Sequence, residues 1–279
     1  MIRLLVILLL TTILSFRSAS QIIEPKEDAL IEVGYTKTVS IDTIGQKYFH
    51  KSPMTLRVGK SSSMFFPDKK MFLDSLDYYD NYAGMNMILS YMMKGEPVTD
   101  IGGWEDEYIF RNVRDDETFV CRSFATYHMG YAEKTLLPEW TIKPDSTRQL
   151  LGHECLYATT SFRGREWEAW FAPELPLKEG PWKLAGLPGI VLLAQDKNGQ
   201  YLFEATSIRT EDIPTVGIFI YNRKPLDMMK SREEYLKALY FLDLKGKFMN
   251  EVSVHTNFKV KVGDRIPLYD FEEVDYPHD

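Results

Sequence analysis

Alternation of apolar and polar residues runs through much of the chain and predicts β-strands. Near the N-terminus, apolar residues recur at intervals of two, at Ile31, Val33, Tyr35, Val39 and Ile41. A period of two places successive side chains on opposite faces of a strand, so that one face is buried and the other meets water. The pattern predicts a half-buried strand over residues 31–41 and a second strand from 54–58 toward 63–66.

Three pairs of apolar-rich runs are separated by short turns and predict antiparallel hairpins. The turns are expected at Asp115–Asp116, Arg163–Gly164 and Asn198–Gly199. Acidic residues, Asn and Gly favour tight turns because they tolerate the backbone angles that a chain reversal requires. The strands that flank these turns are expected at residues 107–113, 117–124, 151–162, 165–171, 190–194 and 200–208.

The strand predicted at residues 165–171 carries a tryptophan on each face. One face is formed by Arg165, Trp167, Ala169 and Phe171, and the other by Glu166, Glu168 and Trp170. We expect such a strand to pack on one side and to line a groove or a second layer on the other, because successive side chains point in opposite directions.

Two segments show the three-to-four spacing of helices. Apolar residues from Phe72 to Met87 follow this spacing, but Gly84 interrupts it, so the segment is interpreted either as a helix or as an irregular aromatic-rich insertion. Ser231 and Glu234 have the spacing of a capping box and predict a helix that ends at Gly246. A last strand is expected over residues 251–262. The sequence therefore predicts a mainly β fold of the β-rich α+β class: an antiparallel sheet, possibly a half-barrel, with one or two helices.

The first twenty residues have the layout of a secretory signal peptide. Arg3 is followed by an apolar run from Leu4 to Phe16, and Ser18 and Ser20 provide small residues before Gln21. The run is shorter than the roughly 20 residues that span a bilayer, which disfavours an uncleaved anchor. We expect residues 1–20 to be removed and residues 21–279 to form a single exported domain, periplasmic or secreted, without a transmembrane segment.

Charge disfavours nucleic acid as a partner. The formal net charge is −7, and it becomes −9 once Arg3 and Arg17 leave with the signal peptide, because 31 basic residues then face 40 acidic ones. An acidic protein without a basic stripe repels a phosphate backbone.

Both cysteines, Cys121 and Cys155, remain after cleavage, and export places them where disulfides persist. A bridge between them would close a loop of about 34 residues and stabilise the fold by roughly 3 to 4 kcal/mol. The alternative is two separate thiols that are buried as small apolar side chains.

The sequence contains no recognisable catalytic or metal site, and we expect no cofactor. The five histidines lack zinc-protease spacing, and His153 with Cys155 supplies two ligands where a closed zinc site needs four. Glu166 and Glu168 lie on one strand face, as exposed acids commonly do. The methionines of residues 85–93 suit a soft metal or an irregular core, and we favour the core.

The segment GPWKLAGLPGIV, residues 180–191, contains two turn signals. Gly180–Pro181 forms the first, and Pro188–Gly189 fits a type II turn in which Gly189 has a positive φ. The segment resembles the signature of the GLPGLI family, exported proteins of Bacteroidetes. The matching residues are Gly186, Leu187, Pro188, Gly189, Ile190 and Val191, with flanks at Trp140, Ile142, Gly152–Cys155, Gly164, Arg165, Trp167, Trp170, Pro173, Pro176, Gly180–Trp182, Asp196, Phe203 and Ala205.

What the resemblance implies is modest, because the family is largely of unknown function. Its β-rich pattern is similar to the antiparallel half-barrels of periplasmic lipoprotein carriers, an analogy of fold class alone. We therefore predict a non-catalytic β-domain of the cell envelope that binds an unknown apolar ligand or an envelope protein. Its candidate lining residues are Trp167, Trp170, Trp182 and Leu187. The alternative is a periplasmic or secreted hydrolase whose site is assembled from residues distant in sequence.

Overall fold

The computed structural model describes residues 23–43, 46–80, 82–96, 105–124, 127–219, 226–242 and 272–276. The predicted signal peptide, Gly246 and the strand expected over 251–262 lie outside these residues. None of the helices in the described ranges is long and apolar enough to cross a membrane.

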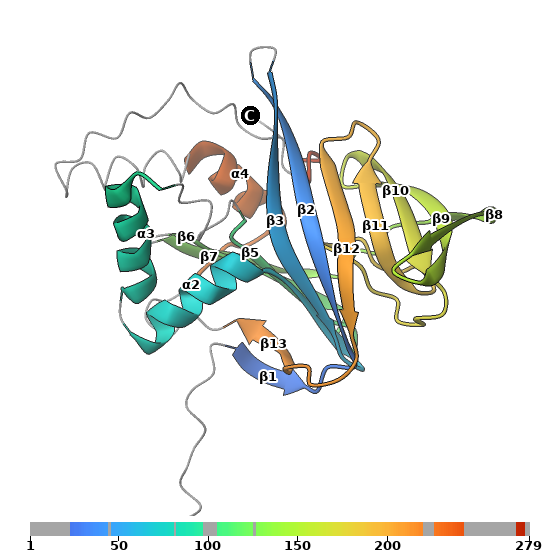
Figure 1. Cartoon of the computed structure of the whole chain (residues 1–279), viewed down its shortest axis with the longest axis horizontal. Helices are drawn as coiled ribbons and strands as arrows, with labels where there is room; N and C mark the ends of the chain where they lie inside the picture. The colour runs from blue at the N-terminus through green and yellow to red at the C-terminus, as the bar shows by residue number, and fades with distance from the viewer. Residues whose placement is uncertain are drawn as a thin grey trace, which may run out of the picture.

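One large sheet dominates the structure (Figure 1). Twelve strands form it, in the order β14-β7-β6-β5-β4-β3-β2-β12-β11-β10-β9-β8. In chain order they are β2 (Ile31–Thr43), β3 (Gln46–Val58), β4 (Ser62–Pro67), β5 (Glu107–Asn112), β6 (Glu117–Phe124), β7 (Tyr127–Lys134), β8 (Thr141–Leu150), β9 (His153–Phe162), β10 (Arg165–Ala172), β11 (Ile190–Asp196), β12 (Tyr201–Arg209) and β14 (Asp227–Met228). β1 (Ile23–Glu27) and β13 (Val216–Phe219) form a separate antiparallel pair.

The sheet is open and almost wholly antiparallel. Only β14 pairs in parallel, with β7, among the pairings of the described strands. β14 and β8 are the two edges, so the sheet does not close into a barrel. Figure 1 shows β2, β3 and β12 in the middle of the molecule, with β8–β11 on one side and β5–β7 on the other. The predicted mainly β, antiparallel fold is confirmed.

The three predicted hairpins are all present. β5 pairs with β6, β9 with β10, and β11 with β12. At the β9–β10 turn, Arg163 and Gly164 have φ angles of 53° and 81°. Two consecutive positive φ angles match the twist of the flanking strands, which is why this two-residue turn is so short.

The described residues contain three helices where the sequence predicted one or two: α2 (Asp68–Tyr79), α3 (Ala83–Lys94) and α4 (Arg232–Leu242). The stretch from Phe72 to Met87 is two helices because Tyr82 has a φ of 69°, which no helix continues. At Gly84 a β-carbon would lie 2.7 Å from the carbonyl oxygen of Leu73, so glycine lets α3 pack closely on α2.

The predicted capping box of α4 is confirmed. The Glu234 amide donates to the Ser231 hydroxyl at 3.2 Å, and the Glu234 carboxylate accepts from the Lys230 amide at 2.7 Å. These bonds satisfy backbone donors that the first helical turn leaves without partners.

Apolar side chains pack on both faces of the sheet. The inner face, as we call it, carries the large cluster that includes Tyr35, Phe65, Trp167 and Phe203, and α4 adds Tyr235 to it. The outer face carries a smaller cluster near α2, built from Met64, Phe66, Tyr108, Phe110, Cys121 and Val216. Neighbouring residues of β4 thus serve different cores, as the alternation of a strand requires.

The predicted disulfide is wrong. Cys121 and Cys155 are both free and buried. Cys121 belongs to the smaller cluster and Cys155 to the large one, and seven strands separate β6 from β9 in the sheet. Bridged cysteines need Cα atoms within about 7 Å, so these positions act as small apolar side chains.

The turn expected at Pro188–Gly189 also differs from the prediction. The positive φ, 99°, belongs to Gly186, and Gly189 is not among the glycines with a positive φ. A β-carbon on Gly189 would lie 2.2 Å from the carbonyl oxygen of Ala172. Glycine is needed here because the start of β11 touches the end of β10, and Leu187 and Ile190 anchor the segment in the core.

Candidate functional site

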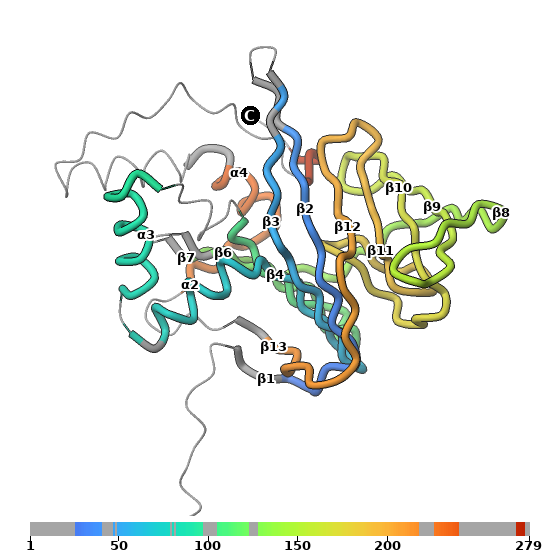
Figure 2. Tube along the Cα trace, viewed as in Figure 1, coloured from blue at the N-terminus to red at the C-terminus, as the bar shows by residue number. Residues whose placement is uncertain are grey.

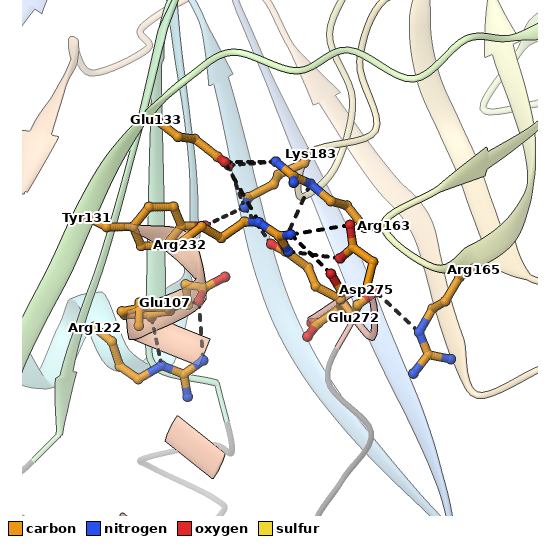
Figure 3. Close-up of polar contacts among 12 residues, drawn as sticks. Glu107, Arg122, Tyr131, Glu133, Arg163, Arg165, Lys183, Arg232, Glu272 and Asp275 are labelled. Carbon is orange, nitrogen blue, oxygen red and sulfur yellow. Dashed lines mark hydrogen bonds and ion pairs between the residues drawn. The ribbon is translucent and has the colours of Figure 1, made fainter. Parts of the chain in front are cut away.

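A network of charged side chains lies within the inner face of the sheet. The strands contribute Lys37 on β2, Glu107 on β5, Arg122 on β6, Glu133 on β7 and Arg165 on β10; α4 and the loops add Arg232, Arg163 and Lys183. Figure 3 shows these side chains converging from both halves of the sheet. Buried charges are costly unless they are paired, so the pairing of this network decides whether the inner face is stable.

The acidic segment, residues 272–276, lies in the middle of the network. Figure 2 shows it in red beside β2. Glu272 forms an ion pair with Lys37, which also binds Glu105 at 2.6 Å. The carbonyl oxygen of Glu272 accepts from Nε of Arg165 at 3.2 Å. The segment therefore meets β2 and β10, which are far apart in sequence.

Glu273 is the centre of the acidic segment. Its carboxylate lies 2.5 Å from Nζ of Lys183, 2.5 Å from Arg232 and 3.6 Å from Arg163. Glu133 shares two of these cations, at 2.8 Å from Arg163 and 3.2 Å from Lys183. Two carboxylates and three cations thus form one connected cluster, which Figure 3 draws.

The rest of the acidic segment is also held. Asp275 lies 2.9 Å from Arg232, and the Val274 amide donates to the Arg163 carbonyl oxygen at 3.0 Å. A β-carbon on Gly164 would lie 2.7 Å from the Val274 side chain, so the hairpin turn lets the segment approach closely. Tyr276 is 7% exposed and belongs to the large apolar cluster.

A second group of charges adjoins the first. Arg122 lies 2.7 Å from Asp106 and 3.4 Å from Glu107, and the Tyr235 hydroxyl donates to Glu107 at 2.9 Å. Burial raises the pKa of Glu107 above its ordinary value. Arg122 responds in the opposite way: burial alone would lower its pKa, but the nearby Asp106 carboxylate raises it overall.

Lys37 and Glu272 stabilise each other's charged forms. Burial opposes the charge on both, yet the Glu105 and Glu272 carboxylates raise the pKa of Lys37. In the same way the Lys37 ammonium lowers the pKa of Glu272 despite its burial. Both groups therefore remain ionised at neutral pH, as a charge-assisted contact requires.

The inner face leaves little open space. A pocket beside Lys183 and Trp182, also lined by Arg111 and Glu133, has a cavity volume of about 10 Å³. This volume holds about one water molecule. Burial lowers the pKa of Arg111 to about 10, and Arg111 pairs with Glu179. Within the described ranges no group of three or more His, Cys, Asp or Glu side chains is placed to hold a metal ion.

Three of the four predicted lining residues are core residues. Trp167 is 1% exposed, Trp182 4% and Leu187 1%, so they do not form a binding surface in this conformation. The prediction was wrong for them because Trp167 and Trp182 stack on each other, with ring centroids 5.5 Å apart, inside the large cluster. The motif residues Ile190 and Val191 are fully buried as well.

Trp170 alone of the predicted lining residues lies on the outer face and is only partly buried. Its ring lies 5.1 Å from that of Tyr157, with Arg148 5.9 Å from its centroid. Lys143 lies 5.3 Å from the Tyr157 centroid. We call these four residues the aromatic patch. Glu168 beside it accepts from Gln195 at 3.0 Å.

Sequence reasoning missed most of the aromatic patch. The β9–β10 register places Tyr157 opposite Trp170, which the predicted hairpin could have revealed. Arg148 was not accessible in this way, because the β8–β9 register shifts between Lys143 and Thr147. A β-bulge reassigns side chains to faces without a clear signal in the sequence.

The other candidate residues do not converge. His153 contacts Glu174 at 3.0 Å, and the Cys155 thiol beside it is buried. Glu166 accepts from the Ser161 hydroxyl on the outer face. The methionines of α3 are not core residues as predicted: Met93 is 77% exposed, and the others, Met85, Met87 and Met92, are partly buried.

The fold and site define a mainly β domain with an open twelve-stranded sheet and a charged inner face. A family model described as the N-glycanase peptide, N-terminal domain, matches residues 132–232, from the end of β7 to the start of α4. The motif at Gly186–Val191 and the aromatic patch both fall within this range. No curated protein matches the sequence.

Solved structures similar to this chain include PNGF-II in two crystal forms. Both are 18% identical with a TM-score of 0.47, and they cover 71% and 78% of this chain but 31% and 32% of PNGF-II. The chain thus spans about a third of the length of PNGF-II. A LolA superfamily protein, NE2245 from Nitrosomonas europaea, is 8% identical with a TM-score of 0.26, covering 69% of this chain and 90% of that protein.

Proposed function

We propose that this protein is an exported, non-catalytic binding domain of the cell envelope, of the GLPGLI type, and that it binds saccharide chains at the aromatic patch. The observation that carries the proposal is the pairing of two partly exposed rings, Trp170 and Tyr157, at 5.1 Å on the outer face. Aromatic rings offer flat apolar surfaces against which a sugar ring packs.

Polar groups around the rings support the choice of a sugar. Glu168 and Gln195 lie next to the patch and are already oriented by their mutual hydrogen bond of 3.0 Å. A few fixed polar groups beside an apolar surface are what a binding site uses to orient a ligand. Arg148 and Lys143 add donors that suit hydroxyl or carboxylate groups of a saccharide.

The family match supports the same ligand class. The matching model describes an N-terminal domain of an N-glycanase, and its range of 132–232 contains every residue of the patch. Export rests on the layout of residues 1–20, and the GLPGLI assignment rests on Gly186–Val191 with its flanks. An apolar ligand inside the sheet is less well supported, since the pocket beside Lys183 is only about 10 Å³.

Binding of N-glycopeptides to the mature protein, residues 21–279, tests the proposal by calorimetry. Trp170→Ala should weaken binding at least tenfold, about 1.4 kcal/mol. Phe49→Ala is the matched control, because Phe49 is 61% exposed and has Lys47 5.9 Å from its ring centroid. Equal binding by wild type and Trp170→Ala, or no binding of any glycopeptide by wild type, would refute the proposal.

A second candidate is a glycan hydrolase, favoured by the name of the matching family model alone. Glu166 and Glu168 are its best acids, and both accept hydrogen bonds on the outer face, from Ser161 and Gln195. Mass spectrometry of a glycoprotein incubated with the mature protein tests for released glycan. Release that disappears in a Glu166→Gln, Glu168→Gln double variant would favour the hydrolase over the binding domain.

A further inference from the structure

The acidic segment, residues 272–276, is held in place as a ligand is held, by side chains rather than by the sheet. Within the described residues it makes one hydrogen bond between main chains, from Val274 to Arg163. A strand of the sheet would be joined to its neighbour through a regular series of such bonds. The remaining contacts are ion pairs and side-chain hydrogen bonds to Lys37, Arg163, Arg165, Lys183 and Arg232.

The charges of the inner face require an acidic partner at this position. The five cations that touch the segment have side chains only 5% to 15% exposed. Outside the segment they share three carboxylates, those of Glu105, Glu133 and Asp196. Buried cations that outnumber their partners are strongly unfavourable, so an empty site would attract carboxylates.

The site also selects the shape and order of the occupant. It accepts a carboxylate at Glu272, a second at Glu273 that three cations surround, and a third at Asp275. Gly164 admits the main chain of the occupant at close range. The large apolar cluster takes an aromatic ring at Tyr276. These features describe an extended segment of acid, acid, apolar, acid and aromatic residues.

We propose that the inner face is a binding site for acidic extended peptides, that the chain's own residues 272–276 occupy it, and that an acidic segment of another polypeptide can replace them. Ion pairs give such a site its selectivity, whereas the single main-chain bond leaves the occupant exchangeable. In the free protein the tethered segment has an effective concentration that a second peptide must overcome. The site is separate from the aromatic patch, which lies on the other face.

The test uses the full mature chain and a fluorescent peptide of sequence FEEVDYPHD, the last nine residues. The triple variant Glu272→Gln, Glu273→Gln, Asp275→Asn loses its own ligand charges but keeps the five cations. Fluorescence anisotropy should show that the triple variant binds the peptide at least tenfold more tightly than wild type does. A control peptide FQQVNYPHD should not bind, and Lys183→Met in the triple variant should abolish binding of the acidic peptide.

Trp170→Ala in the triple variant should leave peptide binding unchanged, which separates this site from the proposed saccharide site. The inference is overturned if the triple variant keeps the wild-type circular dichroism spectrum and does not bind the acidic peptide. It is also overturned if wild type binds as tightly as the variant. Should the triple variant not fold, the single variant Glu272→Gln replaces it, with the same peptides and an expected gain of at least threefold over wild type.

Discussion

The two faces of β10 follow the same alternating pattern but have opposite fates. Trp167 on the inner face is 1% exposed and stacks on Trp182, whereas Trp170 on the outer face is partly buried and contacts Tyr157 and Arg148. Charges differ in the same way, since those on the inner face are enclosed and paired. A tryptophan in a strand thus stabilises the core or offers a surface, and its neighbours across the sheet decide which.

The largest difference between the faces should appear when each tryptophan is truncated. Trp167→Ala should reduce the free energy of unfolding by about 4 kcal/mol, because it leaves a cavity in the large cluster. Trp170→Ala should cost about 1 kcal/mol or less, since its side chain is only partly buried. Urea unfolding measures both values. Equal losses for the two variants would contradict the assignment of Trp167 to the core and Trp170 to the surface.

A buried cation should matter more than an exposed one. Lys183→Met should destabilise the fold by about 3 kcal/mol, because it leaves Glu133 and Glu273 with less compensation inside the protein. Lys143→Met on the outer face should change stability by less than about 0.5 kcal/mol. Thermal unfolding of the two variants, which make the same chemical change, compares the faces directly. A Lys183→Met variant as stable as wild type would mean that the network is not essential to the fold.

The smallest effect should be a difference in pH dependence between two carboxylates of the inner face. The pKa of Glu272 is lowered below its ordinary value of 4.5, net of a burial effect that raises it, because of Lys37. Its contribution to stability is therefore present above about pH 4.5 and is lost as the pH falls through the lower folded pKa. Glu272→Gln should be less stable than wild type at pH 7, and this deficit should shrink on acidification.

Glu107 should behave in the opposite sense. Burial raises its pKa, so the folded state binds the proton more tightly than the unfolded state. The resulting stability is present below the unfolded pKa and is lost as the pH rises through the folded one. Relative to wild type, Glu107→Gln should gain stability between pH 4 and pH 7, as measured by urea unfolding across that range. Parallel pH profiles for the two variants would show that the shifts do not have opposite signs.

Much of the fold was accessible from local pattern. The alternation at Ile31–Ile41 lies within β2, the Arg163–Gly164 turn joins β9 and β10, and Ser231 with Glu234 caps α4. Each of these depends on residues a few positions apart, where period and turn chemistry act directly. The helix break at Tyr82 was not predicted, because no proline or glycine occupies that position.

The candidate site was mostly inaccessible to the same reasoning. Lys37 and Glu272 are 235 residues apart, and Lys183 and Glu273 are 90 apart. No periodicity connects such pairs. The four predicted lining residues were chosen for their apolar character alone, and that property does not distinguish Trp170 at the surface from Trp182 in the core.

The sequence by itself determined the strands, the hairpins and the inward or outward direction of each side chain on β10, because these depend on backbone stereochemistry and a period of two. Only the tertiary structure decided that Cys121 and Cys155 lie in separate cores, that Gly189 is needed for its closeness to Ala172, and that the acidic segment lies among five cations. The reason is physical: the curvature of the sheet and the bulge in β8 set distances between strands that no local pattern records.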